Sequence, residues 1–124
     1  MGWFKIITFI SVGFFARRAL LGLKGDNVKI SPFVFIKNPR NIFIGHDVFI
    51  NHNCNLWASN KSQIHIGNNV LFGPGVSVIA SNHGTRKGQL IRLQDDNDMT
   101  IKIGNDVWIG ANAVITAGVK IADG

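Results

Sequence analysis

The chain is poor in cysteine, with Cys54 alone among its 124 residues. A single cysteine excludes an internal disulfide. Cys54 also occupies an inward position of the repeat described below, which favours a small buried thiol over a reactive nucleophile. The composition and the position of Cys54 therefore give no support for cysteine-based nucleophilic catalysis.

Long hydrophobic runs are missing as well. The apolar part of the N-terminal segment runs from residue 6 to 16, and a membrane-spanning helix needs about 20 such residues. No small-residue cleavage site follows, so we predict no cleavable signal peptide and a cytoplasmic protein. Residues 1–23 are expected to form a helix with two possible roles. It lies peripherally on the inner membrane surface, through contacts of residues 1–24, or covers the end of the fold, and the two roles do not exclude each other.

Acidic residues are scarce: seven Asp and Glu stand against 13 Lys and Arg, for a formal charge of +6. The excess is confined to residues 1–46, which contain seven basic residues and Asp26 as the one acidic residue. The rest of the chain holds six of each sign. This balance gives little support for nucleic-acid binding by the main part of the chain, and the length fits one domain.

A five-residue phrase occurs four times, as isoleucine, glycine, two mostly polar residues and a small apolar residue. The copies are Ile44–Val48, Ile66–Val70, Ile103–Val107 and Ile109–Ala113. Around them apolar residues return in steps of six. This period predicts a triangular solenoid over residues 24–124, in which positions one and five point inward. Glycine at position two permits backbone angles that a side chain would resist, and Asn or Asp at positions three and four suit bends. A sandwich of short strands would not keep this register.

One long insertion interrupts the six-residue period. From position 66 to 103 the chain carries nineteen residues beyond three hexads, and we place this loop at 84–100. Long loops in compact domains are usually functional or disordered. His83 lies where the loop begins and is the candidate general base, because imidazole accepts a proton near neutral pH. The remaining histidines are expected on the outer surface: His46, His52 and His65.

These motifs resemble the hexapeptide-repeat acyltransferases over residues 24–124, and most of all the galactoside, maltose, capsule and exopolysaccharide O-acetyltransferases. The resemblance implies an all-β, left-handed parallel β-helix, and the handedness rests on the resemblance alone. It further implies an acetyl-CoA-dependent O-acetyltransferase without a metal. The acceptor would be a sugar hydroxyl, in surface-polysaccharide biosynthesis.

The resemblance also assigns roles to individual residues. His83 would deprotonate the acceptor hydroxyl, which attacks the thioester directly. Asn51 would contact the acceptor or the tetrahedral oxyanion, and Trp108 would shape the pocket for acceptor and thioester. Trp108, Ala111 and Arg86 would contact acetyl-CoA. Family members are trimers with active sites between neighbouring subunits, so a homotrimer is expected.

The charged residues of the long loop divide into two groups. The basic group, Arg86, Lys87 and Arg92, is expected to meet CoA phosphates or an anionic sugar. The acidic group is expected to be a solvated part of the loop: Asp95, Asp96 and Asp98. Metal binding by these aspartates is disfavoured.

Several alternatives are open or disfavoured on the sequence. The family's chains continue for about two coils beyond the point matching Gly124, which suggests a fragment, or else a non-catalytic remnant that only oligomerises. A γ-type carbonic anhydrase would need a second histidine five residues after His83, where this chain has Gly88. Serine acetyltransferases are disfavoured because their large helical N-terminal domain is missing, whereas antibiotic acetyltransferases remain possible.

Overall fold

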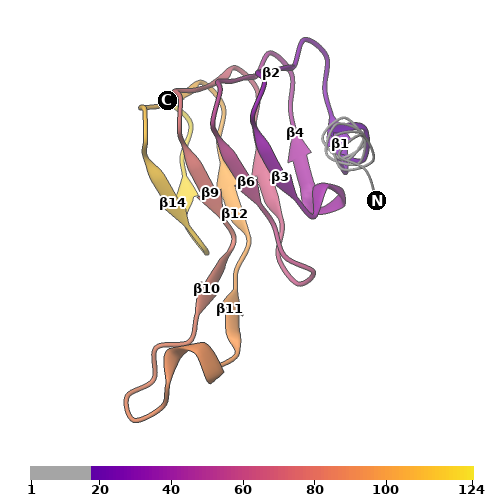
Figure 1. Ribbon diagram of the computed structural model, residues 1–124. Helices are drawn as coiled ribbons and strands as arrows, with labels where there is room; N and C mark the ends of the chain where they lie inside the picture. The colour runs from indigo at the N-terminus through magenta and orange to yellow at the C-terminus, as the bar shows by residue number, and fades with distance from the viewer. Residues whose placement is uncertain (1–17) are drawn as a thin grey trace.

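A computed structural model describes residues 18–124 (Figure 1). The helix expected over residues 1–23 falls mostly on residues 1–17, outside the described part of the chain. Within residues 18–124 no helix is both long enough and apolar enough to cross a membrane. The described chain is built almost wholly from short strands, with 3₁₀ turns at Pro39–Asn41 (η1) and Ile91–Leu93 (η2).

Three parallel sheets form the three faces of a prism, and each coil gives one strand to each face. Face A contains β1 (Leu23–Lys24), β4 (Ile42–Ile44), β7 (Ile64–Ile66), β12 (Ile101–Ile103) and β15 (Lys120–Ile121). Face B contains β2 (Lys29–Ile30), β5 (Phe49–Ile50), β8 (Val70–Phe72) and β13 (Val107–Ile109). Face C contains β3 (Phe35–Lys37), β6 (Asn55–Trp57), β9 (Ser77–Ile79) and β14 (Val114–Thr116).

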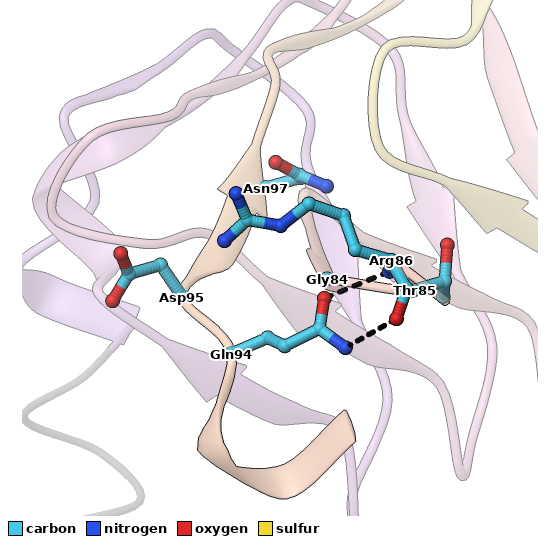
Figure 2. Close-up of a pocket in the computed structure, with 6 residues that line it drawn as sticks. All are labelled: Gly84, Thr85, Arg86, Gln94, Asp95 and Asn97. Carbon is cyan, nitrogen blue, oxygen red and sulfur yellow. Dashed lines mark hydrogen bonds between the residues drawn. The ribbon is translucent and has the colours of Figure 1, made fainter. Parts of the chain in front are cut away.

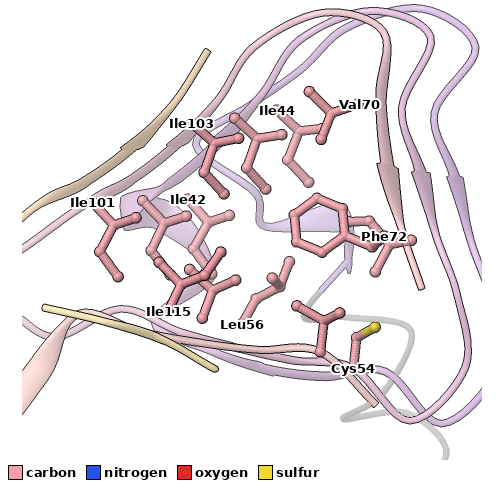
Figure 3. Packing of buried hydrophobic residues seen from close by; sticks show 14 of the residues in the cluster. Ile42, Ile44, Cys54, Leu56, Val70, Phe72, Ile101, Ile103 and Ile115 are labelled. Carbon is pink, nitrogen blue, oxygen red and sulfur yellow. The ribbon is translucent and has the colours of Figure 1, made fainter. Parts of the chain in front are cut away.

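The hexad register predicted from the sequence is confirmed in the strand pairing. First positions stack on first positions: Ile44 pairs with Ile66 and Ile50 with Phe72. Their side chains fill the interior of the prism, as Figure 3 shows. Cys54 is fully buried among them, and burial raises the pKa of its thiol, as expected for a packing residue. At the last described coil the pattern weakens, where Val119 is 37% exposed.

At the prism corners, the residues with unusual backbone angles are not the glycines that the sequence predicts. Positive φ falls on Asn and Asp at position four, such as Asp47 (φ 57°) and Asn69 (φ 56°). Glycine at position two instead allows close stacking of coils: a Cβ on Gly45 would lie 2.7 Å from the Gly67 carbonyl oxygen. A side-chain ladder joins the coils there, with Asn68 Oδ1 accepting the His46 backbone N–H at 2.8 Å. Contact between coils thus requires glycine at Gly25, Gly45, Gly67 and Gly104, but not at Gly110.

The long insertion forms an antiparallel hairpin of β10 (Ser81–His83) and β11 (Asp96–Asp98). It projects away from the stack in Figure 1. The hairpin lies between β9 on face C and β12 on face A, so it leaves the prism at the corner that these faces share. In a triangular cross-section, face B lies opposite that corner.

Candidate active site

His83 and Asp96 face each other across the hairpin as a register pair of β10 and β11. His83 Nδ1 lies 2.9 Å from Asp96 Oδ1, and both side chains are largely exposed. An ionised carboxylate only accepts hydrogen bonds, so a neutral His83 in this contact carries its proton on Nδ1. The Nε2 lone pair is then directed away from Asp96 and can accept a proton.

The distal part of the hairpin is held by the side chain of Gln94, which is almost completely buried. Gln94 Oε1 accepts the Arg86 backbone N–H at 2.8 Å, and its Nε2 donates to the carbonyl oxygens of Arg86 and Gln89 at 3.1 Å each. Figure 2 shows the bonds between Gln94 and Arg86, which join the two sides of the loop. A Cβ on Gly84 would lie 2.8 Å from Gln94 Cβ, so the chain is closely packed at this point. The loop that follows His83 therefore has a defined shape.

A groove of about 660 Å³ runs between the hairpin and face C, and we call it the hairpin groove. Its size is typical of ligand sites. His83 and Asp96 form part of its lining. The other lining residues are Lys37, Trp57, Ile79, Ser81, Asn82, Thr85, Asn97, Met99, Val114 and Thr116.

Asp98 anchors the base of the hairpin. A hydrogen bond from Ser81 holds the pKa of the Asp98 carboxyl below its ordinary value, and burial acts in the opposite direction. A hydrogen bond from Ser59 and the charges of Lys61 and Lys37 add to the lowering. The expectation that the acidic group is merely solvated is wrong for Asp96 and Asp98, because both have specific partners.

We expect Asp98 to make stability pH-dependent. Its folded pKa lies below the ordinary 3.8, so its contribution is present above that value and is lost as pH falls through the folded pKa. The free energy of unfolding of the wild type should therefore exceed that of Asp98→Asn at neutral pH, and the gap should narrow towards about pH 3. Urea unfolding at both pH values, with Asp95→Asn as a charge-removal control on the same hairpin, measures it. A gap that stays constant on acidification would contradict the assignment.

The remaining predicted site residues lie elsewhere on the prism, apart from Arg86 on the hairpin. Trp108 is on β13 of face B, 78% exposed, in register with Leu71. Asn51 follows β5 and accepts the His52 backbone N–H at 2.9 Å. Ala111 follows β13 and is exposed. Asn51, Trp108 and Ala111 do not line the hairpin groove, so a single chain does not gather the predicted set.

Several proteins similar to this chain in sequence or in structure are named as acetyltransferases. The chain is 34% identical over 99 residues to the galactoside O-acetyltransferase of Escherichia coli K12, covering 80% of this chain and 47% of that protein. It is 35% identical over 105 residues to a putative acetyltransferase of Saccharomyces cerevisiae, covering 84% of this chain and 52% of that protein. A crystal structure of a hexapeptide-repeat-containing acetyltransferase from Vibrio cholerae superposes with a TM-score of 0.73 at 30% identity, covering 86% of this chain and 59% of that one. In sequence and in fold, this chain is similar to the hexapeptide-repeat acetyltransferases.

Further solved structures show the same similarity. A maltose O-acetyltransferase from Clostridium difficile has a TM-score of 0.77 at 29% identity, covering 89% of this chain and 57% of that one. A galactoside acetyltransferase in complex with coenzyme A has a TM-score of 0.75 at 28% identity, covering 90% of this chain and 54% of that one. The fold is the predicted left-handed parallel β-helix. The chain spans about half the length of the curated relatives it matches, and no family model matches it.

Two residues of the hairpin groove were not singled out by the sequence analysis. Asp96 was grouped with the solvated acidic residues, and Trp57 was not considered. The outward position of Trp57 in its hexad was a usable signal, since a large aromatic residue facing outward needs another role than core packing. Among residues 18–124, no three or more His, Cys, Asp or Glu side chains are arranged to hold a metal ion.

Proposed function

We propose that this chain transfers the acetyl group of acetyl-CoA to a hydroxyl of a sugar, with His83 as the general base. The observation that carries the proposal is the His83–Asp96 contact at the hairpin groove. Relatives named as galactoside and maltose O-acetyltransferases support the same reaction and acceptor class. The Vibrio cholerae relative has also been solved in complex with acetyl coenzyme A.

His83 performs both proton transfers in this mechanism. Its Nε2 removes the proton of the acceptor hydroxyl as the oxygen bonds to the acetyl carbonyl carbon. The same nitrogen then returns the proton to the CoA sulfur as the carbon–sulfur bond breaks. Asp96 is a positioning residue, which keeps the Nδ1 proton in place and the ring oriented. Direct transfer of this kind needs no nucleophile on the protein.

We further propose that the working site lies between protomers of a homotrimer. His83 and Arg86 leave the prism at the corner opposite face B, and Trp108 is exposed on face B. One chain therefore cannot bring the indole to its own imidazole, whereas the hairpin of one protomer can reach face B of the next. Near Trp108 the surface is open, since a Cβ on Gly110 would meet no heavy atom within 4 Å. Small residues at Gly110 and Ala111 leave room for acetyl-CoA.

Shared sites make a complementation experiment decisive. We expect His83→Ala and Trp108→Ala each to lower acetyl transfer as separate homotrimers. A co-expressed, purified mixture should recover activity, because mixed trimers contain sites in which wild-type His83 faces wild-type Trp108. CoA thiol release from acetyl-CoA in the presence of galactosides and maltose measures it, with each single variant as the baseline.

The outcomes separate the alternatives. Recovery above the sum of the two baselines supports a site between protomers, and absence of recovery contradicts it. A wild-type chain without acetyl-CoA turnover on any sugar would favour a non-catalytic chain that only oligomerises. A role in surface-polysaccharide synthesis at the membrane is the narrower proposal, supported by the basic excess of residues 1–46.

A further inference from the structure

The outward row of face C contains an unusual combination of side chains within the hairpin groove. Lys37, Trp57 and Ile79 are in register on β3, β6 and β9, so they lie side by side on the outer surface. Neighbouring strands are about 4.8 Å apart, which makes the row a continuous strip. Trp57 is one of the largest side chains on this face and is 36% exposed.

The groove has two chemically different sides. Its face C side is largely apolar, with Trp57, Ile79 and Val114 facing the opening. Its hairpin side presents polar groups, including Asn82 and Asn97. A pyranose ring has the same division, with an apolar C–H face and a polar rim of hydroxyls. An indole surface suits the C–H face, and amide side chains suit the hydroxyls.

Lys37 adds a positive charge to the apolar side. Its Nζ lies 4.2 Å from the centroid of the Trp57 ring, in a cation–π contact. Lys37 forms no ion pair with any residue of the described chain. Its charge does reach Asp98, but Lys61 acts on the same carboxyl, so two ammonium groups share one carboxylate. The carboxylate of Asp96 is engaged by His83.

We propose that the hairpin groove binds an acidic sugar, with Trp57 under the pyranose ring and Lys37 paired with the anionic substituent. This assignment rests on the proposed function, since it names the acceptor class for the site that contains His83. The ammonium group is a flexible point charge, so a carboxylate or a phosphate on the ring satisfies it. The groove thereby selects anionic over neutral acceptors.

A matched pair of ligands tests the selection. Methyl glucuronide and methyl glucoside differ in a carboxylate and a hydroxymethyl group, and their binding to the full chain can be measured by calorimetry without acetyl-CoA. We expect the glucuronide to bind about tenfold more tightly, as a charge-assisted hydrogen bond allows. Lys37→Met should remove this preference. Lys120→Met, on face A, is the matched control and should retain it, and glucose 6-phosphate shows whether phosphate replaces the carboxylate.

The result also separates this inference from the proposed function. Equal affinity for the two glycosides, failure of both to bind, or a preference that survives in Lys37→Met overturns the assignment. Acetyl transfer to neutral sugars without any preference would leave the proposed function standing and remove the acidic-sugar assignment. Binding that depends on Lys37 without acetyl transfer would support acidic-sugar binding in the groove and contradict the proposed acetyl transfer. Trp57→Ala should weaken both glycosides alike, because both place a C–H face on the indole.

Discussion

Replacing His83 with alanine is expected to lower kcat for acetyl transfer by about 10² to 10⁴, the usual contribution of a positioned general base. The folded structure should persist, since the imidazole is largely exposed and its described partner is Asp96. Changes at such surface positions usually stay within about 0.5 kcal/mol of unfolding free energy. Steady-state thiol release and a thermal melt on the same preparation separate the two effects.

Two variants control this experiment. His52→Ala removes an exposed histidine from a prism corner, and its kcat should equal that of the wild type. Asp96→Asn keeps an oxygen that accepts the Nδ1 proton but removes the charge, so kcat should fall by less than in His83→Ala. Full activity in His83→Ala would refute the general-base role, and a collapse of the melt would mean that the loss has a structural origin.

Truncating Phe72 to alanine is expected to remove about 3–5 kcal/mol of unfolding free energy, as for other buried phenylalanines. Phe72 is 1% exposed and is stacked between Ile50 and Ile109 of the adjacent coils. Each coil meets only its neighbours, so the cavity weakens two coil interfaces at once. Urea unfolding followed by circular dichroism measures the loss.

Phe33→Ala is the matched control, because it removes the same atoms from a side chain that is 78% exposed. Phe33 has a backbone φ of 61°, a conformation that phenylalanine and alanine both disfavour because both carry a Cβ, so the substitution should not relieve backbone strain. Its free energy of unfolding should change by about 0.5 kcal/mol or less. Similar losses in the two variants would contradict an interior built on the hexad register.

The hexad register was predictable because it is a local property repeated many times. Each copy of the phrase has Ile at position one and Val or Ala at position five, and every copy predicts the same three-sided coil. Ile44, Ile50 and Leu56 are all fully or almost fully buried, one on each face. The positions of the glycines in the repeat were also predicted correctly, but their physical role was predicted wrongly. Contact between stacked coils is a long-range property, which the sequence of one coil does not reveal.

The partner of His83 could not be predicted in the same way. Pairing of His83 with Asp96 depends on the register of an antiparallel hairpin inside an insertion that has no repeat. Three aspartates lie within four positions there, and a register shift of one residue would turn a different side chain towards the imidazole. The separation of His83 from Trp108 likewise follows from the corner at which the hairpin leaves the prism.

The stacking geometry decides where the length of this molecule can vary. Ile103 and Ile121 pair on face A and are 18 residues apart, which is one complete coil. Duplicating a coil ahead of the hairpin would lengthen the prism and leave His83 and Trp108 at the same relative height along its axis. The same duplication between the hairpin and β13 would offset them by about 4.8 Å, which would move the imidazole away from the pocket proposed at Trp108. An inserted coil is thus compatible with the proposed reaction when it precedes the hairpin. It is incompatible with the proposed reaction when it lies between the hairpin and β13.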